Sequence, residues 1–181
     1  MSLAAHMLAH CALVAVLAPL VVLARPVNRV LELFSPARRE RTLRWLASRP
    51  IALLTSPPVA WSSFVATQLA FHVTGLYDSA LDDPLVDAVA HVLYVSTALL
   101  FWEVAIGSAL PRRLTGLGPA LYLLLAMPVV DLSAAWLMAN GEAGAGAAMV
   151  AGMTPLGVAA ALSAWRFARA EEARAGLEGT T

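Results

Sequence analysis

Five apolar segments, each about as long as a bilayer is thick, dominate this sequence of 181 residues. A helix needs about 20 largely apolar residues to cross the hydrocarbon core of a membrane. Inside lipid every backbone amide must be paired within the chain, so each segment is predicted to be a helix. The predicted spans cover about residues 3–24, 53–75, 85–107, 117–139 and 143–167.

The composition favours a membrane protein over a water-soluble one. Only 13% of the residues are charged, whereas a soluble domain carries about 25% charged residues. The sequence therefore predicts an all-α, polytopic membrane helix bundle of about five transmembrane helices in the cell membrane. We expect one transmembrane domain over residues 1–170 and a cytoplasmic tail over residues 171–181. The first segment lacks the basic residues that precede a secretory signal, so we expect it to be retained.

The basic residues, all of which are arginine, predict the orientation of the bundle. They lie between the first and second spans, between the third and fourth, and after the fifth. Basic loops stay in the cytoplasm, which puts the N-terminus outside and the C-terminus inside. The arginines are Arg25, Arg29, Arg38, Arg39, Arg41, Arg44, Arg49, Arg112, Arg113, Arg166, Arg169 and Arg174. Segment 25–49 is long enough for a short amphipathic helix on anionic lipid, or for a surface that docks a partner.

All four histidines fall on the outer side of this topology. His6 and His10 lie in the first turns of the first span, His72 at the end of the second, and His91 near the start of the third. His6 and His10 are four residues apart and share a helix face, and Asp87 and His91 repeat that spacing. Ionisable groups inside a membrane usually face the interior of the bundle.

Copper is the metal that best fits this set of residues. Imidazole suits copper, zinc and iron, and thioether or thiolate sulfur favours Cu(I). The predicted metal ligands are His6, His10, His72 and His91, with Asp87 and Met7 as supporting residues. The competing interpretation is structural, because histidines near a membrane interface often bond to headgroups or backbone.

Three other features need a structural explanation. Asp131 and Glu103 are carboxylates within predicted spans, and Asp131 is shallow enough to support a metal site or to relay protons. Met138, Met149 and Met153 add soft sulfur near the outer ends of the last two spans, where methionine more often serves packing. Small residues recur every four positions at Gly144, Ala148 and Gly152, a spacing that allows helices to approach closely in a membrane.

Three elements of the sequence resemble the CtaG family, bacterial membrane proteins associated with assembly of cytochrome c oxidase of the caa type. They are His6-Met7-Leu8-Ala9-His10 followed by Leu17-Ala18-Pro19-Leu20, the run from Phe71 to Leu81, and His91 through Leu99-Leu100-Phe101-Trp102. The resemblance covers about residues 6–165. The chain resembles a short, divergent member, with Asp87 where the family usually has histidine.

The resemblance implies a function, partners and ligands. We expect a copper-binding assembly factor that helps deliver or insert copper into cytochrome c oxidase on the outer face, in contact with oxidase subunits and membrane lipid. By the same resemblance His6, His10, His72 and His91 become the candidate ligands.

Two other functions stay open at this stage. Two histidines on adjacent helices, such as His10 and His72, could bind haem iron axially. The chain could also be a metal-free structural subunit of a respiratory complex. An enzyme is not expected, because no nucleophile–base pair or phosphate loop is found. Nucleic-acid binding is not expected either, because membrane topology explains the arginines.

Overall fold

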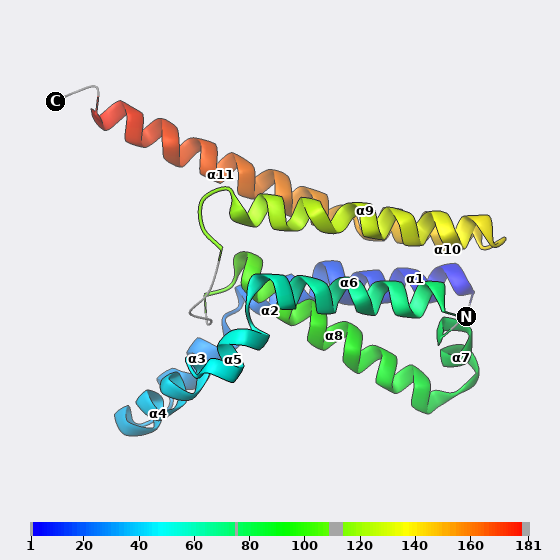
Figure 1. Cartoon of the computed structure of the whole chain (residues 1–181), viewed down its shortest axis with the longest axis horizontal. Helices are drawn as coiled ribbons and strands as arrows, with labels where there is room; N and C mark the ends of the chain where they lie inside the picture. The colour runs from blue at the N-terminus through cyan, green and yellow to red at the C-terminus, as the bar shows by residue number, and fades with distance from the viewer. Residues whose placement is uncertain (1, 75, 109–113, 179–181) are drawn as a thin grey trace.

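The computed structural model describes residues 2–74, 76–108 and 114–178, without the side chains of Tyr77, Asp78 and Leu81. The chain is 87% helical and the described residues contain no strand, which confirms the all-α prediction. Figure 1 shows an elongated bundle whose long helices run lengthwise beside one another.

Five lengthwise passes make up the bundle. The first pass consists of α1 (Leu3–Ala12), a π-helical turn (Leu13–Leu17) and α2 (Ala18–Leu23). The second, third and fourth passes are single helices: α6 (Pro57–Val73), α8 (Pro84–Ile106) and α9 (Gly118–Ala139). The fifth pass consists of α10 (Ala143–Gly152) and α11 (Thr154–Glu178). All except α6 belong to the four helices of the described chain that are long and apolar enough to cross a membrane. The 17 residues of α6 extend about 26 Å, slightly less than the roughly 30 Å hydrocarbon core. It packs lengthwise against α8 and α9.

The predicted boundaries hold for three passes and shift in two. The second helix begins at Pro57 rather than near residue 53, because a proline pair forms its first turn, where a missing N–H costs nothing. The fifth pass is divided at Met153, and α11 continues to Glu178, well beyond residue 167.

Short helices occupy both ends of the bundle. Segment 25–49 contains not one amphipathic helix but parts of three: α3 (Pro26–Glu32), α4 (Pro36–Leu46) and α5 (Arg49–Leu54). A proline in the first turn of each helix explains the division, since proline starts helices readily but cannot continue them. At the other end, α7 (Leu76–Asp82) joins α6 to α8.

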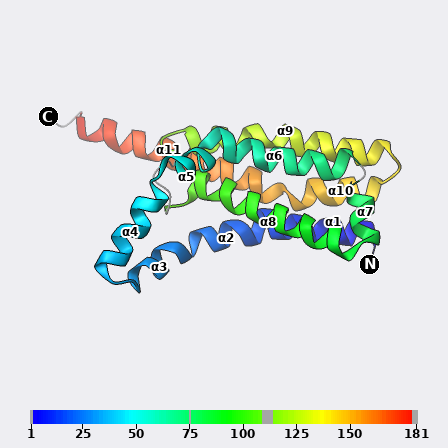
Figure 2. The same cartoon turned by 60° about the horizontal axis from the view of Figure 1, so that its bottom comes forward.

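The two ends differ in charge. The arginine-bearing helices α3, α4 and α5 lie at the end where the C-terminal half of α11 projects, whereas the N-terminus, α7 and the α9–α10 turn lie at the opposite end (Figures 1 and 2). Arg112 and Arg113 lie outside the described residues. This arrangement fits the predicted orientation, which remains a prediction because no membrane is present.

Aromatic stacking and small residues hold the passes together. The Phe101 ring stacks between Phe64 and Tyr122, with centroids 4.3 Å and 4.7 Å away. A Cβ added at Gly152 would lie 2.5 Å from the Cβ of Cys11, so the fifth pass approaches the first too closely for any side chain there. This close contact confirms the packing role predicted for that glycine.

Candidate metal centre

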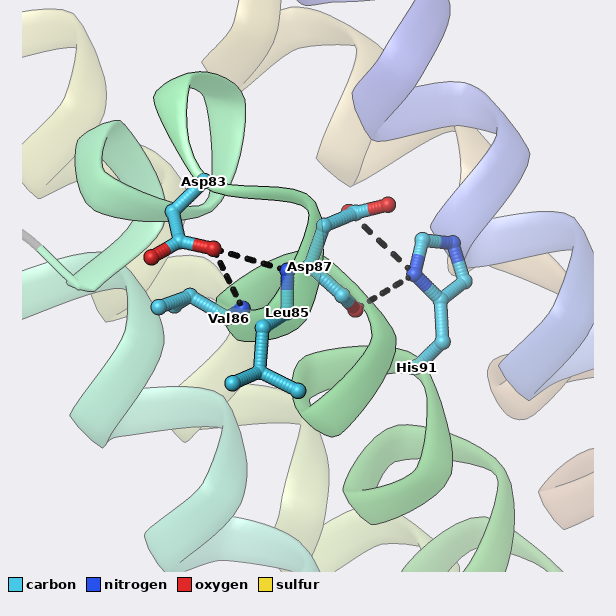
Figure 3. A network of polar contacts seen from close by, with 5 residues as sticks. All are labelled: Asp83, Leu85, Val86, Asp87 and His91. Carbon is cyan, nitrogen blue, oxygen red and sulfur yellow. Dashed lines mark hydrogen bonds and ion pairs between the residues drawn. The ribbon is translucent and has the colours of Figure 1, made fainter.

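The α1, α6 and α8 helices bring their histidines to the same end of the bundle. His6 and His10 lie one turn apart on α1, His91 lies in the N-terminal part of α8, and His72 lies in the last turn of α6. The chain enters α8 through a well-defined cap, because the Asp83 carboxylate accepts hydrogen bonds from the amides of Leu85 and Val86 (Figure 3). This cap fixes where α8 begins and hence the level of Asp87 and His91.

Three of the imidazoles meet in one cluster. The His10 ring centroid lies 4.5 Å from that of His6 and 4.4 Å from that of His91, and the His6 and His91 centroids are 6.2 Å apart. Asp87 adds a carboxylate from the turn of α8 before His91. We call His6, His10, His91 and Asp87 the histidine cluster.

The cluster is closed on one side and open on the other. His10 is only 5% exposed, whereas the side chains of His91 and Asp87 are 36% and 35% exposed. An ion held here would therefore be reachable from the end of the bundle through His91 and Asp87.

Asp87 fixes the orientation and the tautomer of the His91 ring. The Nδ1 of His91 lies 2.9 Å from the Asp87 carbonyl oxygen and 3.2 Å from its carboxylate (Figure 3). Both oxygens are acceptors, so Nδ1 carries the proton and Nε2 of the neutral ring carries the lone pair. Metal-binding histidines usually donate their second N–H to a carbonyl or carboxylate in this way.

Three donor residues of the cluster, without His91, are spaced for a single ion after a small adjustment. One ligand atom each from His6, His10 and Asp87 lie within 4.8 Å of one another. Atoms bound at about 2.0 Å from a common ion are no more than roughly 4 Å apart, so a closure of about 1 Å forms the site.

His72 lies outside the cluster, and the Tyr94 ring lies near both His10 and His72. The Tyr94 ring centroid is 5.0 Å from that of His10 and 6.2 Å from that of His72. His72 is buried, and its Nδ1 donates to the carbonyl of Gln68 at 2.6 Å. The carbonyl one turn earlier in the helix thus fixes the same tautomer in His72 as in His91.

A small cavity whose lining includes four sulfur-bearing residues lies beside His10 and His72. It has a volume of about 10 Å³. The lining includes all the predicted soft atoms except Met138, and we call it the sulfur-lined cavity: its walls include Met7, Cys11, Met149, Met153, His10 and His72. Met7 is therefore placed at this cavity rather than among the residues of the cluster.

The sequence did not identify two residues of this region. Tyr94 lies near both His10 and His72, and Gln68 orients His72. Each lies one helical turn from a predicted histidine, at i+3 from His91 and i−4 from His72, so a search of neighbouring turns could have found them.

The two carboxylates noted within the spans do not join the cluster. Asp131 is exposed on α9. Glu103 is half-buried near the far end of α8 and lines a cavity with Arg25, Thr55 and Ser108. The sequence also suggests that Glu103 reaches Arg112 or Arg113, but both arginines lie outside the described residues.

Comparison with known proteins gives one family. The family model of the cytochrome c oxidase caa3 assembly factor (Caa3_CtaG) matches residues 1–170. No curated protein and no solved structure matches the chain. The family match covers every residue of the histidine cluster and of the sulfur-lined cavity.

Proposed function

Because the chain belongs to the family of cytochrome c oxidase caa3 assembly factors, we propose that it binds copper at the histidine cluster and delivers it to the oxidase at the outer face of the cell membrane. Membership of this family implies association with the oxidase. Copper is then the cargo of the protein, and oxidase subunits that face the outer end of the bundle receive it.

The observation that carries the proposal is the meeting of three imidazoles from two helices. His6 and His10 come from α1 and His91 comes from α8, far apart in the sequence, yet His10 lies within 4.5 Å of both rings. Histidine is costly inside a membrane and is usually functional there. If the three histidines served only to stabilise the fold, nothing would require their rings to lie next to one another.

The donor set fits copper. Neutral imidazoles and one carboxylate form a borderline set of the kind that binds copper or zinc ions. The partly exposed His91 and Asp87 leave a route by which a partner collects the ion. A carrier needs such access, whereas a permanent structural site is closed.

Haem is a weaker candidate for these histidines. Pockets for cofactors measure about 300–1,000 Å³, whereas the cavity beside His10 and His72 measures about 10 Å³. An apolar groove of about 710 Å³ lies elsewhere, between the first and fifth passes, and no histidine lines it. The volumes favour an ion over a macrocycle.

Copper analysis of a double variant tests the proposal. We expect His6→Ala/His91→Ala to lose the copper that co-purifies with the wild-type chain, and oxidase from cells carrying this variant to be copper-deficient. Ser96→Ala, an exposed change on the same helix α8, serves as the matched control and should retain both properties. Full copper in the double variant and in its oxidase would refute the proposal.

A further inference from the structure

We propose that the sulfur-lined cavity is a second metal site, specific for Cu(I), and that His10 connects it to the histidine cluster. The site would bind Cu(I) through the thioether sulfurs of Met149 and Met153 and the imidazole of His72. This proposal rests on the proposed function, since it concerns a further position for the same cargo.

The cavity walls concentrate sulfur from three elements of the fold. Met7 and Cys11 come from α1, Met149 from α10 and Met153 from the junction that follows it. Met7 and Met149 are each 1% exposed and Met153 is 5% exposed. Methionine packs adaptably in cores, but three of the six methionines in the chain at one small cavity form an unusual concentration of soft donors.

The size of the cavity favours a bare ion over a hydrated one. A site needs roughly 10–15 Å³ to hold one water molecule, and this cavity has about 10 Å³. An ion must therefore leave its water behind and exchange it for protein ligands. Cu(I) does so readily with thioethers, whereas Mg²⁺ holds its water strongly and prefers oxygen.

The charges of the candidate ligands also favour Cu(I). Thioether sulfur and neutral imidazole bind Cu(I) without losing a proton, so no new anion has to be buried. Burying one cation of single charge is much less costly than burying Zn²⁺ among neutral ligands. The Cys11 thiol keeps its proton in this arrangement, because Sγ donates a weak hydrogen bond to the carbonyl of Met149 at 4.0 Å.

His72 is oriented as a metal ligand would be. Its Nδ1–H donates to the Gln68 carbonyl, so the lone pair of the neutral ring is on Nε2. The ring lines the cavity from α6, and the sulfur-bearing residues line it from α1, from α10 and from the junction after α10.

His10 lies at both places. Its ring belongs to the histidine cluster through His6 and His91, and it also lines the sulfur-lined cavity. An ion taken up at the partly exposed cluster can therefore exchange its ligands at His10 and move inward to the cavity. His10 supplies a donor atom at both places, so the ion need not cross a region without ligands. The cluster serves uptake and release, and the cavity holds the ion between these events.

Cu(I) titration of the purified, full-length chain under anaerobic, reducing conditions tests this inference. We expect the wild type to bind two Cu(I) ions in competition with a chromophoric Cu(I) chelator, and X-ray absorption to show both nitrogen and sulfur ligands. Met149→Leu/Met153→Leu should bind one ion and lose the sulfur signal. Met127→Leu, which does not line the cavity, is the matched control and should keep both ions. Methionine-to-leucine changes conserve volume, and an unchanged melting curve verifies the fold.

The outcomes separate this inference from the proposed function. Retention of both ions by Met149→Leu/Met153→Leu, or a wild-type spectrum without sulfur ligands, would overturn the second site and leave the cluster intact. A wild type that binds a single Cu(I), which His6→Ala/His91→Ala then loses, would also overturn the second site. A wild type that binds no Cu(I) would overturn both proposals.

Discussion

Two of the four histidines are oriented by the same local device, a carbonyl one helical turn earlier. Gln68 supplies it for His72 and Asp87 for His91. The device needs only helical backbone, so it makes Nε2 the acceptor nitrogen of each neutral ring without another buried polar group. At His91 the Asp87 carboxylate adds a second acceptor for the ring N–H.

Asp87→Asn is expected to weaken copper binding at the histidine cluster by about 10–100-fold, because the charge that orients and polarises His91 is lost. Competition with a chelator of known affinity measures the change. Asp83→Asn is the matched control: asparagine caps a helix as well as aspartate does, and Asp83 faces the amides of Leu85 and Val86. Equal affinities for the two variants would contradict the role of Asp87.

The sequence predicted which of these residues share a helix face better than it predicted how the helices are arranged. The spacing of His6, His10, Asp87 and His91 is helical, so their sharing of faces followed from periodicity alone. The position of His72 outside the cluster did not follow, because it depends on how α6 is rotated against α8. Rotation is set by packing across the bundle, which one sequence does not specify.

At the scale of elements, close contact between the first and fifth passes depends on Gly152. Gly152→Ala should destabilise the protein by about 1–3 kcal/mol, since the new Cβ would overlap Cys11 and force the helices apart. Melting in detergent measures the loss. Gly144→Ala tests the same kind of change where the added Cβ makes ordinary contact with Ala4 at 3.8 Å, and it should be neutral or stabilising by up to about 1 kcal/mol. Equal effects at both positions would refute this explanation.

The π-helical turn of the first pass is held from α8. Trp102 donates its indole N–H to the carbonyl of Val14 at 2.8 Å, within Leu13–Leu17. Trp102→Phe should cost about 1–3 kcal/mol, because a buried carbonyl loses its donor, and the melting temperature should fall. Trp165→Phe, at an exposed tryptophan, is the control and should leave the melting temperature unchanged. A Trp102 variant as stable as this control would show that the bond is not needed.

The positions of helix ends were harder to predict than the helices themselves. Hydropathy located all five passes, since long apolar runs have few alternatives in lipid. It did not predict the π-helical turn, or the division at Met153, which is followed by Pro155 in the first turn of α11. It also placed the start of the second helix near residue 53, whereas the proline pair begins α6 at Pro57.

At the scale of the whole molecule, the charge difference between the two ends predicts a fixed orientation. Cysteine placed at Asn140, in the exposed α9–α10 turn, should react with a membrane-impermeant maleimide added outside intact cells. Cysteine at Ala47, exposed after α4, should react only after the membrane is opened. The unmodified chain is the control, because its single Cys11 is buried. Labelling with the opposite sidedness would place the histidine cluster in the cytoplasm and exclude delivery at the outer face.

Copper content tests most directly whether the histidine cluster binds the proposed cargo. The full chain, purified in detergent after growth with copper, should contain stoichiometric copper by elemental analysis, bound through imidazole nitrogen in its X-ray absorption spectrum and without a haem band. Protein that carries no copper above the level of the His6→Ala/His91→Ala variant would contradict the claim that the cluster is a copper site.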